Sequence, residues 1–326
     1  MKFLSAMPFL AVCLSPAASG VLWAGDPPAV PGLKATRLYV VASENMLAGV
    51  NPRDAIASMS IWIKQLGKMR GFDCEYKVDT AVSLGQVRQR LKEHTADLLV
   101  LDTPDYLSLG DEALVEAIAV GTNRGQLAAF PYLLLSNDAA GADPLAGLRG
   151  KRIIVASRTK SNTRLVWLDT LVAENCLGRA ASFFSSVELS YHGSSCILPL
   201  FFGKIDACVV DSNSWESVKE LNPQLGRLKT LARSEAFLEG LLAMPVQFRH
   251  PYQSEVVNAI LTLHKTLAGE QLGVVFKAGP QVPAEKAQFE SVRALWSKYR
   301  RLVDTSGDVP GSTARRPEET AGKEGP

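Results

Sequence analysis

The sequence predicts an α/β fold in which helices cover mainly parallel β-sheet. Short apolar runs of strand length alternate with longer segments of helical period between about residues 35 and 300. Repeated β-α-β units of this kind build layered α/β structures. The chain of 326 residues is 47% hydrophobic and 21% charged, which is a globular composition, and its length permits two sub-domains.

The first half of the pattern opens with a strand at 37–42 (RLYVVA). A helix is expected over 52–70, because Asn51 suits an N-cap and Pro52 suits a first helical turn. The apolar residues of this helix recur with a helical period, and Gly71 follows it: Ile56, Met59, Ile63 and Leu66. The elements expected next are a strand at 74–78, a helix at 84–94, a strand at 97–101 (DLLVL), a short helix after Thr103 and a strand at 117–120.

An apolar, extended segment at 128–136 (AAFPYLLLS) opens the second half. The elements expected after it are a turn at 145–150, a strand at 152–156, helices at 161–175 and 194–203, a strand at 205–210, a helix at 214–221, an extended segment at 241–248 and helices at 253–268 and 284–299. Three tryptophans fall at helical positions and are predicted to lie in the core: Trp62, Trp167 and Trp215.

The chain ends have their own patterns. One lysine, an apolar run and small residues over 1–24 predict a secretory signal peptide, cleaved after Ser19 or after Ala24. Cys13 follows Val12 rather than a small residue, which argues against a lipid anchor there. No later segment has the length of a membrane helix, so a periplasmic protein is expected. The polar segment 305–326 is predicted to be disordered.

Composition and motifs exclude several classes of function. The net charge of +2 favours neither nucleic acid nor a membrane surface as a partner. The sequence lacks GxGxxG, Walker, GxSxG and HExxH motifs, so no cofactor and no catalytic role are expected. The later cysteines show no paired spacing for a metal and are expected to be buried thiols, with a disulfide between the last two as the alternative: Cys74, Cys176, Cys196 and Cys208.

The order of segments resembles the phosphate/phosphite/phosphonate substrate-binding proteins of ABC transporters, within the type 2 periplasmic binding fold. The matching stretches are NPRDAIASMSIWIKQLG (51–67), ADLLVLDTPDYLSL (96–109), DPLAGLRGKRIIVAS (143–157), WLDTLVAE (167–174) and LPLFFGKIDACVVDSNSWE (198–216). The resemblance covers roughly residues 35–300. It implies capture of a small phosphorus oxyanion for an ABC importer, by a protein that we expect to be a monomer.

The resemblance also implies two lobes, each a mixed β-sheet flanked by helices, with the ligand cleft between them. Lobe 1 would hold residues 33–128 and 233–302, and lobe 2 would hold residues 129–232. The chain would cross between lobes near Phe130 and Leu231, and these crossings would be hinges.

In the family, hydroxyl groups and backbone N–H groups at a helix start in lobe 2 hold the anion, in a motif close to Ser-Thr-Ser-Gly. This chain has SRTKSNTR at 157–164. The candidate ligand-binding residues of this loop are Thr159, Ser161, Asn162 and Thr163. Asn162 and Thr163 replace the expected Ser-Gly, so a carboxylate or a phosphate ester stays an alternative ligand. Ser161 has the alternative role of a helix cap.

Other candidates follow other strands. Thr103 suits a second hydroxyl donor or a helix cap, and Ser43 and Glu44 follow the first strand, where Glu44 suits a ligand ammonium group or is an ordinary loop carboxylate. His192 precedes a turn that approaches the ligand in the family, or is a surface loop residue. Asp211 suits a cationic ligand group or a bond to His192. The alternative for this strand end is a helix capped by its next two residues, Ser212 and Asn213.

Two other functions fit the same pattern. The clamshell would serve equally as a ligand sensor for a membrane receptor or kinase, since the partner surface has no sequence motif. An enzyme of the same fold would need a reactive side chain at the cleft, and Cys196 is the nearest cysteine to the candidate loop. Its neighbours Ile197, Leu198 and Pro199 are typical of packing, and a thiol in an apolar site is a poor nucleophile.

Overall fold

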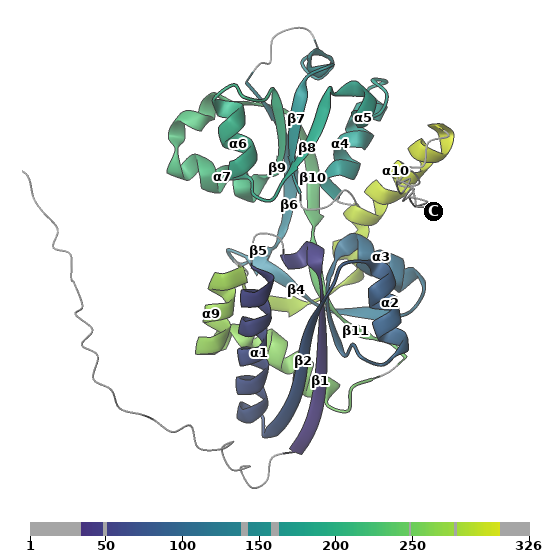
Figure 1. The fold of residues 1–326 in the computed structure, drawn as a ribbon, viewed down its shortest axis with the longest axis vertical. Coiled ribbons are helices and arrows are strands. Elements are labelled where there is room, and N and C mark those ends of the chain that lie inside the picture. Colours follow the sequence, from purple (N-terminus) through teal and green to yellow (C-terminus); the bar gives the residue numbers. More distant parts are fainter. Residues whose placement is uncertain are drawn as a thin grey trace, which may run out of the picture.

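The computed structural model describes residues 34–47, 51–137, 143–157, 163–247, 249–276 and 279–306. The predicted signal peptide (1–24) and Cys13 lie outside the described residues, as does most of the segment 305–326. The structure confirms the predicted α/β class: strands and helices alternate along the chain, and the strands form two sheets (Figure 1).

The first sheet has six strands in one path and a seventh at its side. The path is β12 (Gln281–Pro283), β4 (Val115–Asn123), β11 (Gly240–Pro245), β3 (Leu98–Asp102), β1 (Lys34–Ser43) and β2 (Phe72–Ala81), and β5 (Gln126–Leu127) pairs with β4. β1 runs parallel to β2 and β3, whereas β11 and β12 are antiparallel to their neighbours. The sheet is therefore mixed, as expected from the resemblance.

The second sheet has five strands in the order β10 (Lys229–Leu238), β6 (Ala129–Ser136), β9 (Ala207–Asp211), β7 (Arg152–Ala156) and β8 (Ser186–Ser190). β7, β8 and β9 are parallel, and β6 and β10 add the antiparallel pairs. All five residues of β9 are buried, because this strand lies inside the sheet with helices on both faces.

Helices cover both faces of each sheet. Those following strands of the first sheet are α1 (Pro52–Met69), α2 (Leu84–Lys92), α3 (Thr103–Asp111), α8 (Gln253–Thr262), α9 (Leu267–Phe276) and α10 (Glu290–Ser306). Those following strands of the second sheet are α4 (Thr163–Glu174), α5 (Ala180–Phe183), α6 (Ser194–Phe201) and α7 (Ser212–Leu221). Short 3-10 turns are η1 (Glu44–Leu47), η2 (Ala146–Leu148), η3 (Pro223–Arg227), η4 (Leu263–Lys265) and η5 (Lys286–Phe289).

Successive side chains of a strand point to opposite faces of the sheet, so the core has separate parts on the two faces of the second sheet. Leu133 and Leu135 of β6 pack with α6 and α7, whereas Leu134 between them packs with α4 and α5. This follows from the two-residue period of a strand. The Leu134 side of the second sheet belongs to one continuous cluster with the α2 and α3 side of the first sheet. The two sheets thus share a core.

The carboxyl-terminal helix α10 extends this shared core. It contacts α3 and β10 near its start, through Arg293 and Ser291, and it also contacts α4. Figure 1 shows it running from the first sheet up beside the second. The Arg179 guanidinium donates to the Tyr299 hydroxyl at 3.1 Å, and Lys298 pairs with Glu174. On another side, Asn123 donates to Asn213 at 3.0 Å, so side chains also join the sheets there.

The chain passes twice between the sheets, at Ala128 between β5 and β6 and at Glu239 between β10 and β11. The first passage lies close to Phe130. The second does not lie near Leu231, since β10 pairs with β6 over its whole length and keeps 233–238 in the second sheet.

Several expected elements changed in the structure. α7 begins at Ser212 and is capped by Asp211, so the predicted caps Ser212 and Asn213 are wrong. α10 continues to Ser306, two residues into the segment expected to be disordered. β8 and β10 were not predicted, because both are edge strands with few buried side chains and hence no apolar alternation.

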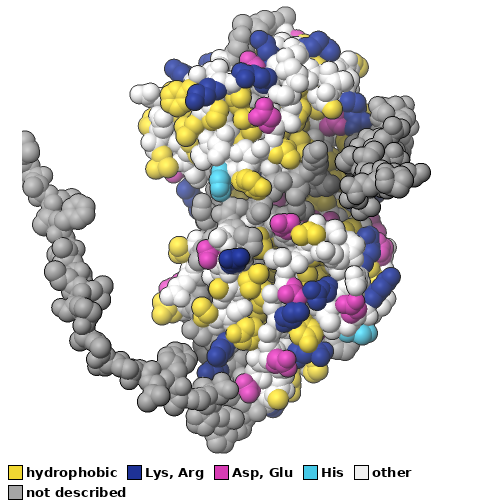
Figure 2. Space-filling model, in the orientation of Figure 1, with side chains coloured by type: hydrophobic (Ala, Val, Ile, Leu, Met, Phe, Trp, Pro, Cys, Tyr) yellow, Lys and Arg dark blue, Asp and Glu magenta, His cyan; other side chains and the backbone are white. Residues whose placement is uncertain are grey.

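The three tryptophans predicted to be buried lie in the core, and charged residues of both signs lie on the surface. The three tryptophans named above are buried, with exposed fractions of 7–8%. On the face drawn in Figure 2, Lys and Arg side chains are interspersed with Asp and Glu. Among the described helices, none is both long and apolar enough to cross a membrane.

We expect Leu134→Ala to lower the free energy of unfolding by about 2–5 kcal/mol, because it leaves a cavity in the shared core. Leu221→Ala is the matched control, since Leu221 is 88% exposed, and it should change stability by less than about 0.5 kcal/mol. Urea unfolding followed by fluorescence measures both. Equal effects of the two substitutions would contradict the core described above.

Candidate functional site

The carboxyl ends of the parallel strands of both sheets face one another where the chain passes between them. In the first sheet, β3 ends at Asp102, which pairs with Gly240 at the start of β11. In the second sheet, β9 ends at Asp211, which pairs with Tyr132 near the start of β6. Glu239 is the single residue between β10 and β11, so it lies between these two edges. Ligands of open α/β sheets bind at such carboxyl ends.

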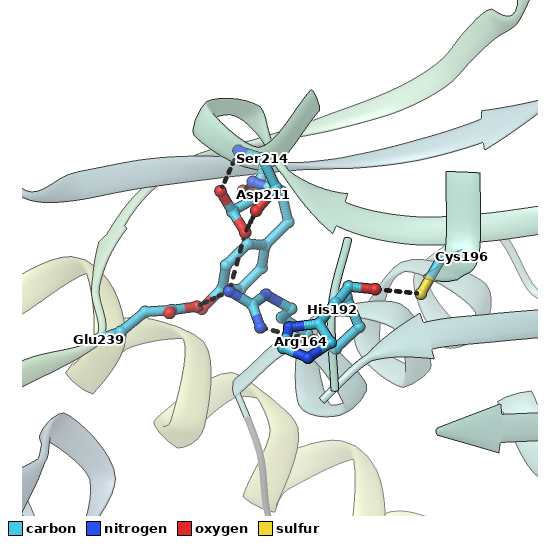
Figure 3. A network of polar contacts seen from close by, with 9 residues as sticks. Arg164, His192, Cys196, Asp211, Ser214 and Glu239 are labelled. Atoms are coloured by element: carbon cyan, nitrogen blue, oxygen red, sulfur yellow. Dashed lines mark hydrogen bonds and ion pairs between the residues drawn. The ribbon is translucent and has the colours of Figure 1, made fainter. Parts of the chain in front are cut away.

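A polar network centred on Arg164 fills this junction (Figure 3). One guanidinium nitrogen, Nη2, lies 3.1 Å from the Asp211 carboxylate and 2.6 Å from that of Glu239. The other, Nη1, donates to the carbonyl oxygen of Ala156 at 2.5 Å. The guanidinium lies over the ring of Tyr132, 5.2 Å from its centre, and the Tyr132 hydroxyl donates to Glu239 at 2.9 Å. Residues of α4, β6, β7, β9 and the second passage are thereby joined.

Burial makes these interactions strong. The Arg164 side chain is 13% exposed and that of Asp211 is 11% exposed, whereas that of Glu239 is 39% exposed. Burial alone lowers the pKa of the Arg164 guanidinium, but Glu239 and then Asp211 raise it by more, so Arg164 stays protonated. Burial and the neighbouring Glu239 charge hold the pKa of Tyr132 well above its usual range. Tyr132 is therefore a hydrogen-bond donor at neutral pH.

Asp211 has a second task at the start of α7. Its carboxylate accepts hydrogen bonds from the Ser214 N–H at 2.7 Å and the Ser214 hydroxyl at 2.8 Å, and so caps the helix. Among the described residues, Asp211 makes no hydrogen bond to His192, although this bond was one of its two predicted roles. The cation that it binds belongs to the protein itself, namely Arg164.

The described residues at the two ends of the predicted anion loop, Ser157 and Thr163, lie next to Ala156 and Arg164 of this network. Ser157 follows the last residue of β7 and is buried, and Thr163 is the first residue of α4 and is buried at 6% exposure. The candidate residues Thr159, Ser161 and Asn162 lie outside the described residues. Because Arg164 is the second residue of α4, a guanidinium lies within one turn of the predicted anion-binding helix start.

Thr103 does not cap α3 in this structure, and its ligand-binding role stays a prediction. It is fully buried, its hydroxyl donates to the carbonyl oxygen of Leu238, and its N–H donates to the carbonyl oxygen of Glu239. The cap of α3 is instead Asp102, whose carboxylate accepts from the Asp105 N–H at 2.9 Å. Thr103 thus fastens the end of β3 to the second passage between the sheets.

The other candidates lie at the same edges with fewer contacts. Ser43 is the last residue of β1 and is buried, and Glu44 begins η1 and is partly exposed. His192 is exposed, and its carbonyl oxygen accepts from the thiol of Cys196. The turn beside His192 approaches α7 closely, since a Cβ on Gly193 would lie 2.7 Å from that of Ser214. The ligand-binding roles of these residues stay predictions.

Sequence reasoning missed the central three residues of the network: Tyr132, Arg164 and Glu239. A signal was present for two of them. Arg164 is the one charged residue within the apolar run of T-R-L-V-W-L, and Glu239 interrupts the apolar F-L-E-G-L-L between two extended segments. A charge at such a position needs a buried partner, but the sequence does not say which one.

The cysteines of the described part of the chain are free thiols, so the alternative disulfide between Cys196 and Cys208 is not formed. Burial, together with lesser effects, raises the pKa of Cys196 to about 12 and that of Cys74 to about 11. Cys176 is exposed, which corrects the expectation that all four are buried. Within the described ranges, no group of His, Cys, Asp and Glu side chains has the arrangement of a metal site.

The chain is similar to known proteins in sequence and in fold. Residues 46–289 match the family model described as ABC transporter, phosphonate, periplasmic substrate-binding protein. Among curated protein sequences, no significant match was found.

Solved structures share the fold at low sequence identity. A Xanthomonas citri protein bound to a chloride ion has a TM-score of 0.62 at 12% identity, covering 82% of this chain and 99% of that one. A binding protein component of an ABC phosphonate transporter from Pseudomonas aeruginosa has a TM-score of 0.60 at 12% identity, covering 84% and 90%. PhnD1 from Prochlorococcus marinus, in complex with methylphosphonate, has a TM-score of 0.57 at 16% identity, covering 82% and 99%.

We expect Asp105→Asn to stabilise the protein more at pH 8 than at pH 5. Burial and the nearby Asp102 charge raise the pKa of Asp105 to about 7 in the folded protein, whereas its ordinary value is 3.8. The folded protein therefore binds this proton more tightly than the unfolded chain, and stability falls as the pH rises from about 4 to about 7.

Chemical unfolding at both pH values measures the difference, which should be on the order of 2 kcal/mol. Asp54→Asn, at an exposed position of α1, controls for the loss of a carboxylate. A stabilisation by Asp105→Asn that is the same at pH 5 and pH 8 would show that Asp105 is ionised throughout.

We expect Cys176 to react first with a maleimide at pH 7.5, because its side chain is exposed. Cys74, Cys196 and Cys208 should react more slowly, since burial raises the pKa of each thiol and little thiolate forms. Mass spectrometry of peptides from the native protein identifies the labelled residue. Rapid, selective labelling of Cys196 would instead support a catalytic role at this site.

Proposed function

The chain belongs to the family of phosphonate-binding periplasmic substrate-binding proteins of ABC transporters, and we propose that it captures a small phosphorus oxyanion between its two sheets for delivery to an importer. The family match carries this proposal, because residues 46–289 include strands of both sheets and both passages between them. The ligand would be phosphate, phosphite or a phosphonate.

The proposed anion site is the segment 157–163 at the start of α4. Backbone N–H groups at a helix start and the hydroxyls of Thr159, Ser161 and Thr163 provide donors for an oxyanion, and Asn162 adds an amide. The protonated Arg164 offsets part of the negative charge of Asp211 and Glu239 beside this segment. Ser43, Glu44 and His192 would line the facing edges.

We propose that the two sheets with their helices form two lobes that close on the ligand. The passages at Ala128 and Glu239 would bend, since these are the points where the chain leaves one sheet for the other. In this assignment residues 229–238 move with lobe 2, because β10 pairs with β6. Closing would remove the bound anion from water and strengthen its hydrogen bonds.

The proposed setting is that of an exported protein. The segment 1–24 would direct export to the periplasm and be cleaved after Ser19 or Ala24, with no lipid anchor at Cys13. There the protein would act as a monomer that binds and releases its ligand unchanged, with an ABC permease as its partner.

Calorimetry on protein that was unfolded, dialysed and refolded to remove carried ligand tests the proposal. Methylphosphonate, phosphite and phosphate should each be compared with sulfate and acetate, and at least one phosphorus oxyanion should bind more tightly than both. No heat and no thermal stabilisation with any of the three would contradict the proposed function.

Ser161→Ala and Thr159→Val should each weaken binding of the preferred anion by about 10- to 100-fold, because each removes a hydrogen bond to a charged group. Ser185→Ala is the matched control, because Ser185 is exposed at the opposite edge of the second sheet, where its N–H donates to the carbonyl oxygen of Lys151. An affinity unchanged in both loop variants would remove segment 157–163 from the site.

A further inference from the structure

We propose that Arg164 is a built-in cation that occupies the carboxylate pair of Asp211 and Glu239, so that the protein selects phosphorus oxyanions without an ammonium group. The inference rests on the proposed function and narrows its ligand class. It reassigns Asp211, whose position at a strand end suits a cationic ligand group, to a cation supplied by the chain.

The two carboxylates converge on one point. Each has an oxygen within hydrogen-bond distance of the same nitrogen, Nη2 of Arg164, at 3.1 Å for Asp211 and 2.6 Å for Glu239. Two carboxylates this close together favour one cation, because a positive charge between them relieves their repulsion while both stay ionised. In this protein that position is taken by a guanidinium (Figure 3).

Further contacts fix the guanidinium in place. Nη1 of Arg164 donates to the carbonyl oxygen of Ala156, and the planar group lies on the ring of Tyr132. The side chain is 13% exposed, so water competes little for it. A ligand ammonium would have to displace this buried group, and would leave its positive charge without its two carboxylate partners.

Further donors of the protein also contact the carboxylates. Asp211 accepts two hydrogen bonds from Ser214, and Glu239 accepts one from the Tyr132 hydroxyl. An ammonium group that approached without displacing Arg164 would meet the like charge of the guanidinium. Both routes disfavour a ligand with an amino group.

The same arrangement reduces the repulsion that the anionic end of a ligand would meet at this junction. Without Arg164 the junction would carry two negative charges, from Asp211 and Glu239, next to the start of α4. Arg164 offsets one of these two negative charges, since one guanidinium faces two carboxylates. Because Arg164 is the second residue of α4, its charge lies close to the proposed anion-binding segment.

The pair ethylphosphonate and 2-aminoethylphosphonate tests the inference, since the two ligands differ only by the ammonium group. By calorimetry on refolded wild-type protein, ethylphosphonate should bind at least about tenfold more tightly. In Arg164→Gln the two carboxylates lose their cation, so the preference should fall by at least about tenfold or reverse. Arg164→Lys keeps a positive charge and should retain the wild-type preference.

Equal or tighter wild-type binding of 2-aminoethylphosphonate would overturn the inference, as would an unchanged preference in folded Arg164→Gln. Glu239→Gln serves where Arg164→Gln does not fold, because it makes the junction more positive and should keep or increase the preference for ethylphosphonate. A smaller preference in this variant would also overturn the inference. If neither phosphonate binds but another phosphorus oxyanion does, only the inference fails; if no anion binds, the proposed function fails as well.

Discussion

The ion pair that Arg164 shares between Asp211 and Glu239 is the interaction on which the centre of this protein depends. It joins the first turn of α4, the end of β9 and the single residue between β10 and β11. A buried arginine is stable only with partners that repay its loss of water, and removing one partner of such a pair is strongly destabilising. The network therefore fixes the geometry of the junction between the sheets.

The same junction connects the two sheets through hydrogen bonds. Glu239 accepts from Arg164 with its carboxylate and from the Thr103 N–H with its carbonyl, while Thr103 also donates to Leu238. The start of α4, which packs on the second sheet, is thus connected through Glu239 and Thr103 to the end of β3 in the first sheet. A ligand held at the start of α4 would act on a point that is already coupled to the chain passage.

Sequence reasoning predicted the regular parts of the fold well. The strand 152–156 was predicted with its observed bounds, and Asn51 accepts from the Arg53 N–H as a helix cap should. Elements defined by pairing rather than by their own pattern were missed, such as β10, whose polar side chains face outward at the edge of a sheet. The boundary between the sheets was misplaced for the same reason.

The site was only partly predictable, because a strand end identifies where a side chain emerges and not what it contacts. Asp211 was correctly placed at a strand end, but its cation and its capping role required the positions of Arg164 and Ser214. The most direct measurement is a crystal structure of the complex with methylphosphonate. The account predicts phosphonate oxygens at the start of α4, between the sheets, with Arg164 still bound to Asp211 and Glu239. A phosphonate bound away from the junction, or Arg164 displaced from both carboxylates, would contradict it.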